Sequence, residues 1–446
     1  MAKKQRVSYV CASCGATHSS WVGRCTTCGE WNTVQEQLNV ATAMAGSSGK
    51  RLDLKSINEV TKVKSVERLK VDIGDVDEVL GGGIVPGSVI LIAGQPGIGK
   101  STLLMQVASS IAKKKRVIYI SGEESAEQVA MRATRLGAGG EELILTTSTS
   151  ANDIAATISS DSADLVVVDS IQTLSCSEIA SAAGSVSQIT NSTQLISAAA
   201  KGSGTALLIV GHVTKEGSIA GPKVLEHIVD VVLQLEGDRY GGFKVLRAIK
   251  NRFGSTNEAS IFDMEEGGLR PVDNPSAALL EERQISDGSV VLATVEGTRP
   301  LLVEVQALVN TSSYGYPKRA SSGFDLNRLN LLVAVLERRT KLNLSDKDIY
   351  INIVGGIKIQ DPAADLAVCL AIGSASKGLK LSSDAVVYGE VGLSGEVRHV
   401  PYAEKRISEA KKLGFEKVVG PRIKGKKLAL LHEVKDVRDA LNTFLK

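Results

Sequence analysis

The chain has 446 residues, of which 43% are hydrophobic, 23% charged and 4% aromatic. This length exceeds a single hydrophobic core, so we expect two or three domains. No apolar run approaches the ~20 residues of a membrane span, and the N-terminus lacks a signal-peptide core, which excludes a membrane protein and predicts a cytoplasmic one. The net charge of +3 is uneven: residues 1–70 carry +6 and the remainder −3.

Four cysteines near the N-terminus form two pairs with the spacing of metal ligands, and the two pairs stand ten residues apart. They are Cys11, Cys14, Cys25 and Cys28. Two such pairs provide four thiolates for one tetrahedral zinc ion, which predicts a zinc module over residues 1–35. Gly15 and Gly29 follow the pairs, where a tight turn favours glycine. Redox motifs are the weaker alternative, and His18 is either a substitute ligand or a solvent-facing side chain.

Residues 36–56 are polar and small, which is typical of a linker, and residues 57–275 then alternate between apolar strand and helix patterns. Such alternation predicts a parallel sheet with helices on both faces. The expected strands are 89–93, 117–121, 143–147, 165–169 and 206–211. The expected helices after the one that follows residue 100 are 125–136, 152–159 and 188–200.

The first of these strands leads into the octapeptide GQPGIGKS, residues 94–101, which has the Walker A pattern of a phosphate loop. Its glycines let backbone N–H groups surround a phosphate. Lys100 adds a positive charge for the β and γ phosphates, and Ser101 offers a hydroxyl to Mg²⁺. The expected ATP-binding residues are Gly94, Gln95, Pro96, Gly97, Ile98, Gly99, Lys100, Ser101 and Thr102.

Carboxylates follow two other predicted strands. Asp169 ends the apolar run that begins at Leu165, as in a Walker B site, and is expected to hold Mg²⁺ together with Ser101. Glu123 follows strand 117–121 and is expected to orient or deprotonate the attacking water. Glu124 is the alternative base, and either glutamate could instead cap the helix that begins near Ser125.

These features together resemble the RecA core, and the whole chain resembles the bacterial RadA family, also called Sms. The resemblance rests on the cysteine module and on GGGIVPGS (81–88), SGEES (121–125) and KNRFG (250–254). It implies a recombination ATPase of DNA repair, with ATP, Mg²⁺ and Zn²⁺ as cofactors. It further implies a homo-hexamer that acts as a DnaB-type helicase on single-stranded and branched DNA, with the RecA recombinase as a partner.

The same resemblance implies roles for further residues. His212, which ends strand 206–211, would sense the γ-phosphate at the root of a DNA-facing loop. Lys215 and Lys223 in that loop would contact DNA phosphates. Lys250 and Arg252 of KNRFG would reach across a subunit seam to a neighbour's γ-phosphate.

Residues 276–446 form a second α/β region, which resembles the proteolytic domain of Lon. Ala363 stands where Lon carries its nucleophilic serine, and our alignment places Glu404 at the catalytic lysine, so we expect no proteolysis. The predicted fold class is therefore α/β, with a zinc module, a RecA-type P-loop ATPase core and a Lon-protease-like domain. A non-motor ATP switch is the first alternative to a DNA motor, and an ATP-dependent protease is the second.

Overall fold

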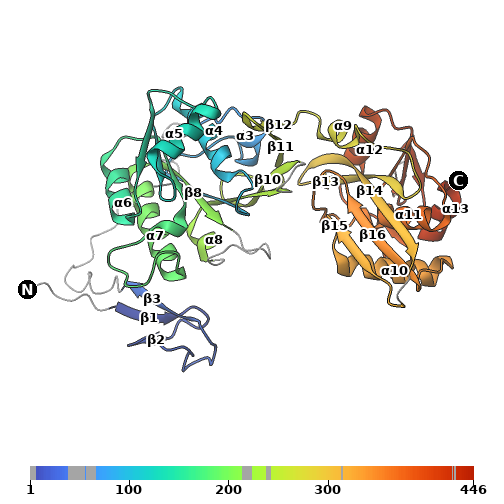
Figure 1. Ribbon diagram of the computed structural model, residues 1–446, viewed down its shortest axis with the longest axis horizontal. Coiled ribbons are helices and arrows are strands. Elements are labelled where there is room, and N and C mark those ends of the chain that lie inside the picture. Colours follow the sequence, from blue (N-terminus) through green and yellow to red (C-terminus); the bar gives the residue numbers. More distant parts are fainter. Residues whose placement is uncertain are drawn as a thin grey trace, which may run out of the picture. The chain divides into compact units, whose positions relative to one another are not determined.

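The computed structural model describes residues 7–38, 56, 67–212, 224–237, 243–312, 315–423, 425 and 428–445 (Figure 1). Its contacts divide the chain into two compact units. The first covers Met1–Leu235, Ala248–Gly254 and Glu266–Gly268, and the second covers Glu236–Arg247, Ser255–Glu265 and Leu269–Lys446.

The N-terminal cysteines lie in a small antiparallel sheet of order β2-β1-β3. Its strands are β1 (Val7–Cys11), β2 (Thr17–His18) and β3 (Val34–Leu38). Cys11 pairs with Val34 at the start of β3, so this strand extends three residues into the predicted linker. Residues 39–55 of that linker lie outside the described part of the chain.

The phosphate loop belongs to a nine-stranded sheet of order β12-β11-β10-β9-β4-β8-β7-β5-β6. The strands are β4 (Val89–Gly94), β5 (Val117–Ser121), β6 (Leu143–Thr147), β7 (Leu165–Asp169), β8 (Ala206–His212), β9 (Val231–Gly237), β10 (Lys244–Asn251), β11 (Ala259–Glu265) and β12 (Gly268–Pro271). The segment from β9 through β4 to β6 is parallel, as the alternating sequence pattern predicts. The carboxyl ends of these strands therefore share one edge.

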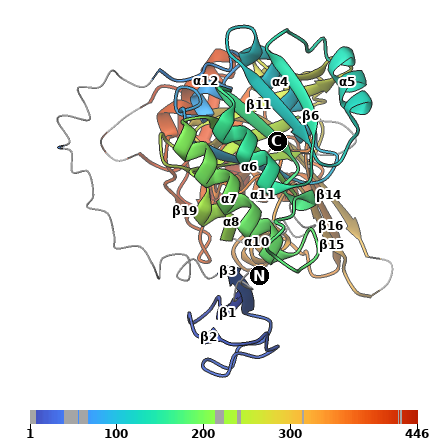
Figure 2. The same ribbon diagram turned by 90° about the vertical axis from the view of Figure 1, so that its left-hand side faces the viewer.

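Helices cover the faces of this sheet (Figures 1 and 2). Apolar side chains of the strands pack against them. The helices of this region are α3 (Val76–Val79), α4 (Lys100–Ala112), α5 (Ala126–Arg135), α6 (Ala151–Ser160), η1 (Ile171–Thr173), α7 (Val186–Ser203) and α8 (Val224–Ile228). Alternate residues of the central strands, such as Leu91, Ile120 and Val168, form one core with α6 and α7. Helix α4 buries Leu104 and Ile111.

Strands β10 and β11 belong to the nine-stranded sheet by hydrogen bonding, yet much of both falls in the second compact unit. Strand pairing and the clustering of contacts therefore place the domain boundary at different residues. The boundary predicted at residue 275 follows the sheet and stays a prediction, as do the other predicted boundaries.

The C-terminal region holds a seven-stranded mixed sheet of order β15-β16-β14-β13-β17-β20-β21. Its strands are β13 (Ser289–Glu296), β14 (Arg299–Thr311), β15 (Arg319–Ser322), β16 (Lys347–Ile353), β17 (Ala385–Val387), β20 (Lys417–Gly420) and β21 (Leu431–Glu433), and β18 (Glu390–Val391) pairs with β19 (Val397–Arg398). The helices are α9 (Pro275–Leu280), α10 (Leu326–Thr340), α11 (Ala364–Lys377), α12 (Ala403–Lys412) and α13 (Val437–Phe444). Two apolar cores result, one with α10, α11 and α13 and the other with α12. In the part of the chain that is described, no helix is both long and apolar enough to cross a bilayer.

Candidate nucleotide site and metal centre

The phosphate loop connects β4 to α4. Three of its glycines stand where the backbone conformation or close packing disfavours a Cβ. Gly97 and Gly99 have φ angles of +79° and +113°, which a residue with a Cβ rarely adopts. A Cβ on Gly94 would lie 2.6 Å from the carbonyl oxygen of Leu235 in the neighbouring strand β9. This close backbone path is what a loop needs to bring its N–H groups around a phosphate.

Lys100 is the first residue of α4 and is only 4% exposed. Its Nζ donates hydrogen bonds to the carbonyl oxygens of Gly94 at 2.9 Å and Gln95 at 3.0 Å, so the charge lies within the loop. Burial lowers the pKa of Lys100 to about 8, and the negative charges of Asp169 and Glu123 offset part of that effect. The arrangement fits a phosphate group, which would bring the compensating negative charge that this buried amine needs.

Asp169 ends β7 and is buried, with 7% of its surface exposed. The hydroxyl of Tyr119, from the adjacent strand β5, donates a hydrogen bond to its Oδ2 at 2.7 Å. The strand register pairs Asp169 with Ser121, two residues before Glu123. The sheet thus brings the predicted Walker B carboxylate and the predicted base to the same edge as the loop.

Glu123 and Glu124 have different partners. Glu123 accepts a hydrogen bond from the Ser170 hydroxyl, directly after Asp169. Glu124 is ion-paired instead with Arg132 of α5, with 2.5 Å between its Oε2 and the NH1 atom. The side chain of Ser125 caps α5 in a capping box, so neither glutamate supplies the N-cap.

A groove of about 450 Å³ opens beside these carboxylates. It is lined by residues 121–127, which leave β5 and enter α5, and by residues 147–149 at the end of β6. Its place at the carboxyl ends of parallel strands is the usual ligand position in open α/β sheets.

The KNRFG motif begins at the end of β10, where its two cations contact their own chain. Lys250 donates hydrogen bonds from Nζ to the carbonyl oxygens of Glu226 and, at 2.8 Å, Val229, around the end of α8. Arg252 lies 3.0 Å from the Asp230 carboxylate, and its side chain is 53% exposed. Asp230 in turn accepts a hydrogen bond from the backbone N–H of Val89, where β4 begins.

The rest of this motif packs against the glycine run that precedes β4. A Cβ on Gly81 would lie 2.9 Å from the Cα of Gly254. The Arg68 guanidinium joins the two segments, because it donates hydrogen bonds to the carbonyl oxygens of Phe253 at 3.0 Å and Gly81 at 2.7 Å. Two motifs far apart in the sequence are therefore one structural element.

Three predicted residues are described only in part or not at all. The backbone of His212 ends β8 and pairs with Gly94 of the phosphate loop, but its side chain lies outside the described structure. Lys215 and Lys223 also lie outside the described residues.

The four cysteine sulfurs converge at the turns of the small sheet, all within 4.8 Å of one another. Cys11 and Cys28 have sulfurs 3.6 Å apart, and those of Cys14 and Cys25 are 3.7 Å apart. Four thiolates at about 2.3 Å from a tetrahedral zinc ion stand about 3.8 Å from each other, so the cluster fits zinc. The Nε2 atom of His18 lies 3.5 Å from the Cys25 sulfur, beside the cluster.

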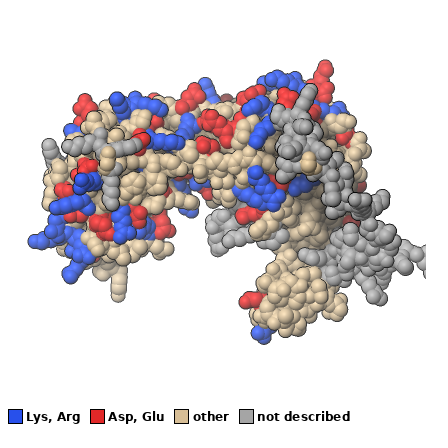
Figure 3. Space-filling view, turned by 180° about the vertical axis from the view of Figure 1, so that it is seen from behind, with Lys and Arg blue, Asp and Glu red and all other residues tan. Residues whose placement is uncertain are grey.

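The surface of this module carries little charge. Between residues 9 and 35 the charged side chains are Arg24 and Glu30, and Figure 3 shows few coloured atoms there. Trp21 and Trp31, the two tryptophans of the chain, are 61% and 67% exposed. Most of the cations that make residues 1–70 positive therefore lie outside the described part of the module.

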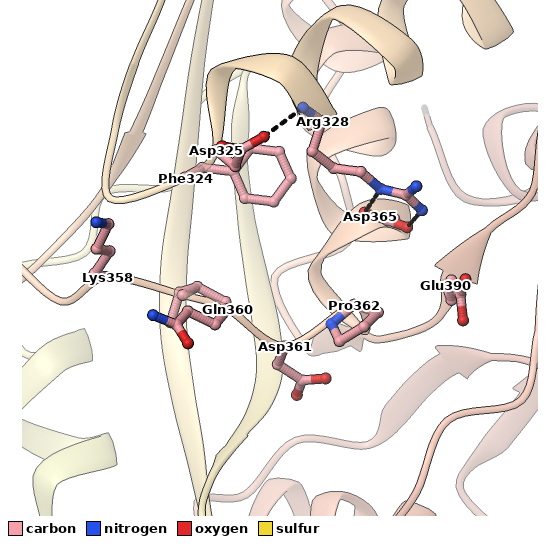
Figure 4. Close-up of a pocket in the computed structure, with 10 residues that line it drawn as sticks. Phe324, Asp325, Arg328, Lys358, Gln360, Asp361, Pro362, Asp365 and Glu390 are labelled. Atoms are coloured by element: carbon pink, nitrogen blue, oxygen red, sulfur yellow. Dashed lines mark hydrogen bonds and ion pairs between the residues drawn. The ribbon is translucent and has the colours of Figure 1, made fainter. Parts of the chain in front are cut away.

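The C-terminal domain contains a pocket of about 510 Å³ whose lining includes Pro362 and Asp365, whereas Ala363 between them is fully buried and does not line it. Figure 4 shows Lys358 and Glu390 at opposite ends of it, with Asp361 between them and the Arg328 guanidinium facing Asp365. Asp365 is 1% exposed, and its charge is balanced by Arg328.

Arg406 is the charged side chain of α12 that points into the domain beside this pocket. It is 2% exposed, and its NH1 atom lies 2.7 Å from Asp361 and 2.6 Å from the carbonyl oxygen of Ala293. Glu404, which our alignment placed at the catalytic lysine, is exposed on the same helix. The residue that faces Asp361 is therefore Arg406, because one side of α12 is buried at positions 403, 406, 407 and 410.

The chain is similar to known proteins over most of its length. Residues 58–218 match the model of an AAA domain, 9–36 that of a rubredoxin metal-binding domain, and 329–423 that of subunit ChlI of Mg-chelatase. A protein named DNA repair protein RadA from Pseudomonas aeruginosa is 47% identical, over 94% of both chains. The chain belongs to the RadA family. RadA of Bacillus subtilis is also 47% identical, over 94% of this chain and 93% of its own, and RadA of Aquifex aeolicus is 45% identical over 94% of both.

Membership of the RadA family, the three domain models and the observed sheets confirm the predicted fold class: a zinc module, a P-loop ATPase core and a C-terminal Lon-like α/β domain. Sequence reasoning missed Tyr119, Arg132 and Ser170, which surround the predicted catalytic carboxylates. Tyr119 lies within an apolar strand, and its hydroxyl was a detectable signal, since a buried phenol needs a hydrogen-bond partner.

Proposed function

We propose that this chain is a DNA-repair ATPase that hydrolyses ATP at the Walker loop and uses the energy to move single-stranded DNA. The observation that carries the proposal is the convergence of Lys100, Asp169 and Glu123 at one sheet edge, in a chain of the RadA family. A cation within a phosphate loop, a buried carboxylate and a second carboxylate nearby are the parts that P-loop hydrolysis requires.

Each residue has a distinct part in the proposed reaction. The loop from Gly94 to Thr102 binds the phosphates, with Lys100 as the charge within it. Ser101 and Asp169 would hold Mg²⁺, which neutralises developing phosphate charge when bound. Glu123 orients the attacking water and accepts its proton, whereas Glu124 is ion-paired with Arg132 of α5.

The proposed working unit is a homo-hexameric ring in which a neighbour's Lys250 and Arg252 complete the nucleotide site. The Arg252 side chain is half exposed, but it would have to leave the Asp230 carboxylate to make such a contact. Lys250 would have to leave the carbonyl oxygens of Glu226 and Val229. His212, next to the loop by its backbone, is proposed as the γ-phosphate sensor.

DNA is the proposed polymer substrate, because the relatives are named DNA repair proteins. Lys215 and Lys223 are the proposed phosphate contacts, and branched recombination intermediates are the proposed structures on which the ring promotes branch migration. The RecA recombinase is proposed as a partner, through a surface that remains to be assigned.

Nucleotide turnover tests the proposal. Lys100→Ala should abolish ATP hydrolysis in the presence of single-stranded DNA, whereas Lys113→Ala, at the exposed far end of the same helix, should hydrolyse ATP like the unmodified chain. Undiminished hydrolysis by Lys100→Ala would reject the site.

A further inference from the structure

Helix α5 is largely exposed, but the side chain of its Arg132 is nearly buried. Helix α5 buries a single apolar residue, Val129, and Arg132 lies one turn further along the same face. Its side chain is 13% exposed and lies at the carboxyl ends of β5 and β7. By contrast, Arg135 in the last turn of this helix is exposed.

The guanidinium of Arg132 connects three groups of the nucleotide site. Its NH1 atom is ion-paired with Glu124, and its NH2 atom donates a hydrogen bond to the Tyr119 hydroxyl oxygen at 3.3 Å. The same NH2 atom lies 3.9 Å from Oδ2 of Asp169. Its Nε is buried and has no hydrogen-bond partner among the described residues.

The Tyr119 hydroxyl gives this network a direction. Because it accepts from Arg132, its own proton is free to be donated, and it is donated to Oδ2 of Asp169 at 2.7 Å. Burial and the nearby Asp169 charge raise the pKa of Tyr119, so the phenol keeps this proton. Among the described residues, nothing donates a hydrogen bond to Oδ1 of Asp169, which therefore remains available as an acceptor.

A role confined to stability explains these contacts poorly. Burying a guanidinium with one nitrogen unpaired is costly, and an apolar side chain beside Val129 would fill the same helix face without that cost. What an apolar residue could not do is fix the positions of two carboxylates, Asp169 at the end of β7 and Glu124 in the loop between β5 and α5.

We propose that Arg132 is the positioning residue of the nucleotide site: through Tyr119 it orients Asp169 toward the magnesium ion, and by direct pairing it holds Glu124 away from the phosphate loop. Glu123, which accepts a hydrogen bond from Ser170, is then the carboxylate assigned to act on water. The inference rests on the proposed ATPase function, because it assigns the arrangement of that site.

Magnesium-dependent nucleotide binding tests this inference without relying on turnover. The probe is a fluorescent ATP analogue, mant-ATP, titrated with Mg²⁺. Arg132→Gln and Tyr119→Phe should each raise the Mg²⁺ concentration at half-maximal binding by about ten-fold, the scale of one lost charge-assisted hydrogen bond. Arg132→Lys keeps the charge but not the forked guanidinium. Its Mg²⁺ concentration at half-maximal binding should lie between those of the two variants and that of the unmodified chain.

The two effects should not add, since both residues act along one chain of hydrogen bonds. The double variant Arg132→Gln with Tyr119→Phe should therefore resemble the single variants. Arg135→Gln is the matched control on the same helix and should leave the Mg²⁺ midpoint unchanged. If circular dichroism shows that Arg132→Gln does not fold, Tyr119→Phe decides, because it removes one oxygen and keeps the ring.

The outcomes separate this inference from the proposed function. Absence of mant-ATP binding by the unmodified chain would reject both. Normal binding and Lys100-dependent hydrolysis, combined with an unchanged Mg²⁺ midpoint in Tyr119→Phe and in folded Arg132→Gln, would overturn only the role of Arg132.

Discussion

The Arg406 guanidinium lies 2.7 Å from the Asp361 carboxylate in the interior of the C-terminal domain. Asp361 stands two residues before Ala363 in the sequence. Proteolysis by a serine needs a neutral amine or similar base beside the nucleophile, and a guanidinium does not lose its proton in proteins. We therefore expect no cleavage of casein with or without ATP. Ala363→Ser should remain inactive while Arg406 is present. Casein cleavage by the unmodified chain that Ala363→Gly or Arg406→Gln abolishes would contradict this.

The neighbouring glutamates should behave differently when each is made neutral. Glu123→Gln should bind ATP but hydrolyse it about 10²–10⁴ times more slowly, the usual contribution of a general base. Glu124→Gln should lose less turnover, because Glu124 contacts Arg132 rather than the water proposed for attack. Nucleotide binding and phosphate release measured on both variants decide between them, and the reverse order would make Glu124 the base.

Metal removal should unfold the N-terminal module and leave the ATPase core folded. Among the described residues of the module, the buried core consists of Cys11, Cys25 and Val34, which is too little to hold a fold without its metal. We expect one zinc per chain by elemental analysis, none in Cys25→Ser, and an undiminished value in the matched variant Cys176→Ser. Zinc-free protein whose module resists proteolysis as before would contradict the assignment.

Unfolding of the module should shift the wavelength of tryptophan emission only slightly. Trp21 and Trp31 are already more than half exposed in the folded module. Their emission maximum should shift little on chelation, while intensity changes as Trp31 loses the Arg24 guanidinium, which lies 5.7 Å from its ring. Proteolysis within residues 7–38 is therefore the better readout of unfolding.

The central strands β5 and β7 were predictable because burial on both faces makes their sequences almost continuously apolar, whereas the edge strand β6 is partly exposed along its length. The expected bounds of β5, β6 and β7 agree with the structure residue by residue. The phosphate loop was predictable for a related reason, since its glycines and lysine stand at fixed spacing next to such a strand.

Side-chain partners were not predictable in the same way. Arg132 is one charged residue among several on a polar helix, and only the fold shows that it faces Asp169. The choice between Glu123 and Glu124 likewise depends on Ser170 and Arg132, which no local spacing connects. Arg406 could have been found, because the buried positions of α12 recur at helical spacing and Glu404 is not among them.

Lys250 and Arg252, here called the finger residues because they are proposed to reach into a neighbour's nucleotide site, can be tested by mixing variants. If Lys250 acts across a subunit seam, Lys250→Ala rings should bind ATP and lose most turnover. A Lys100→Ala chain retains an intact finger, and a Lys250→Ala chain retains an intact pocket. Mixed rings should therefore regain some hydrolysis at seams where both halves are sound.

The contacts of Lys250 with its own chain require a control in this experiment. Its amine caps the end of α8, so Lys250→Ala should also lower the free energy of unfolding by about 1 kcal/mol. Thermal melting of each variant separates this loss from the loss of turnover. Rings shown to be mixed that recover no hydrolysis would place the action of Lys250 within its own subunit.

Strand displacement on a branched DNA substrate tests the proposed motor most directly. The unmodified chain with ATP should displace a labelled strand from a three-way junction, and Lys100→Ala should not. Both should be assayed beside DNA-stimulated hydrolysis on the same preparation, so that a switch that uses ATP without moving DNA is recognised. ATP hydrolysis with no displaced strand, in preparations shown to bind the junction, would contradict the motor and favour the ATP switch.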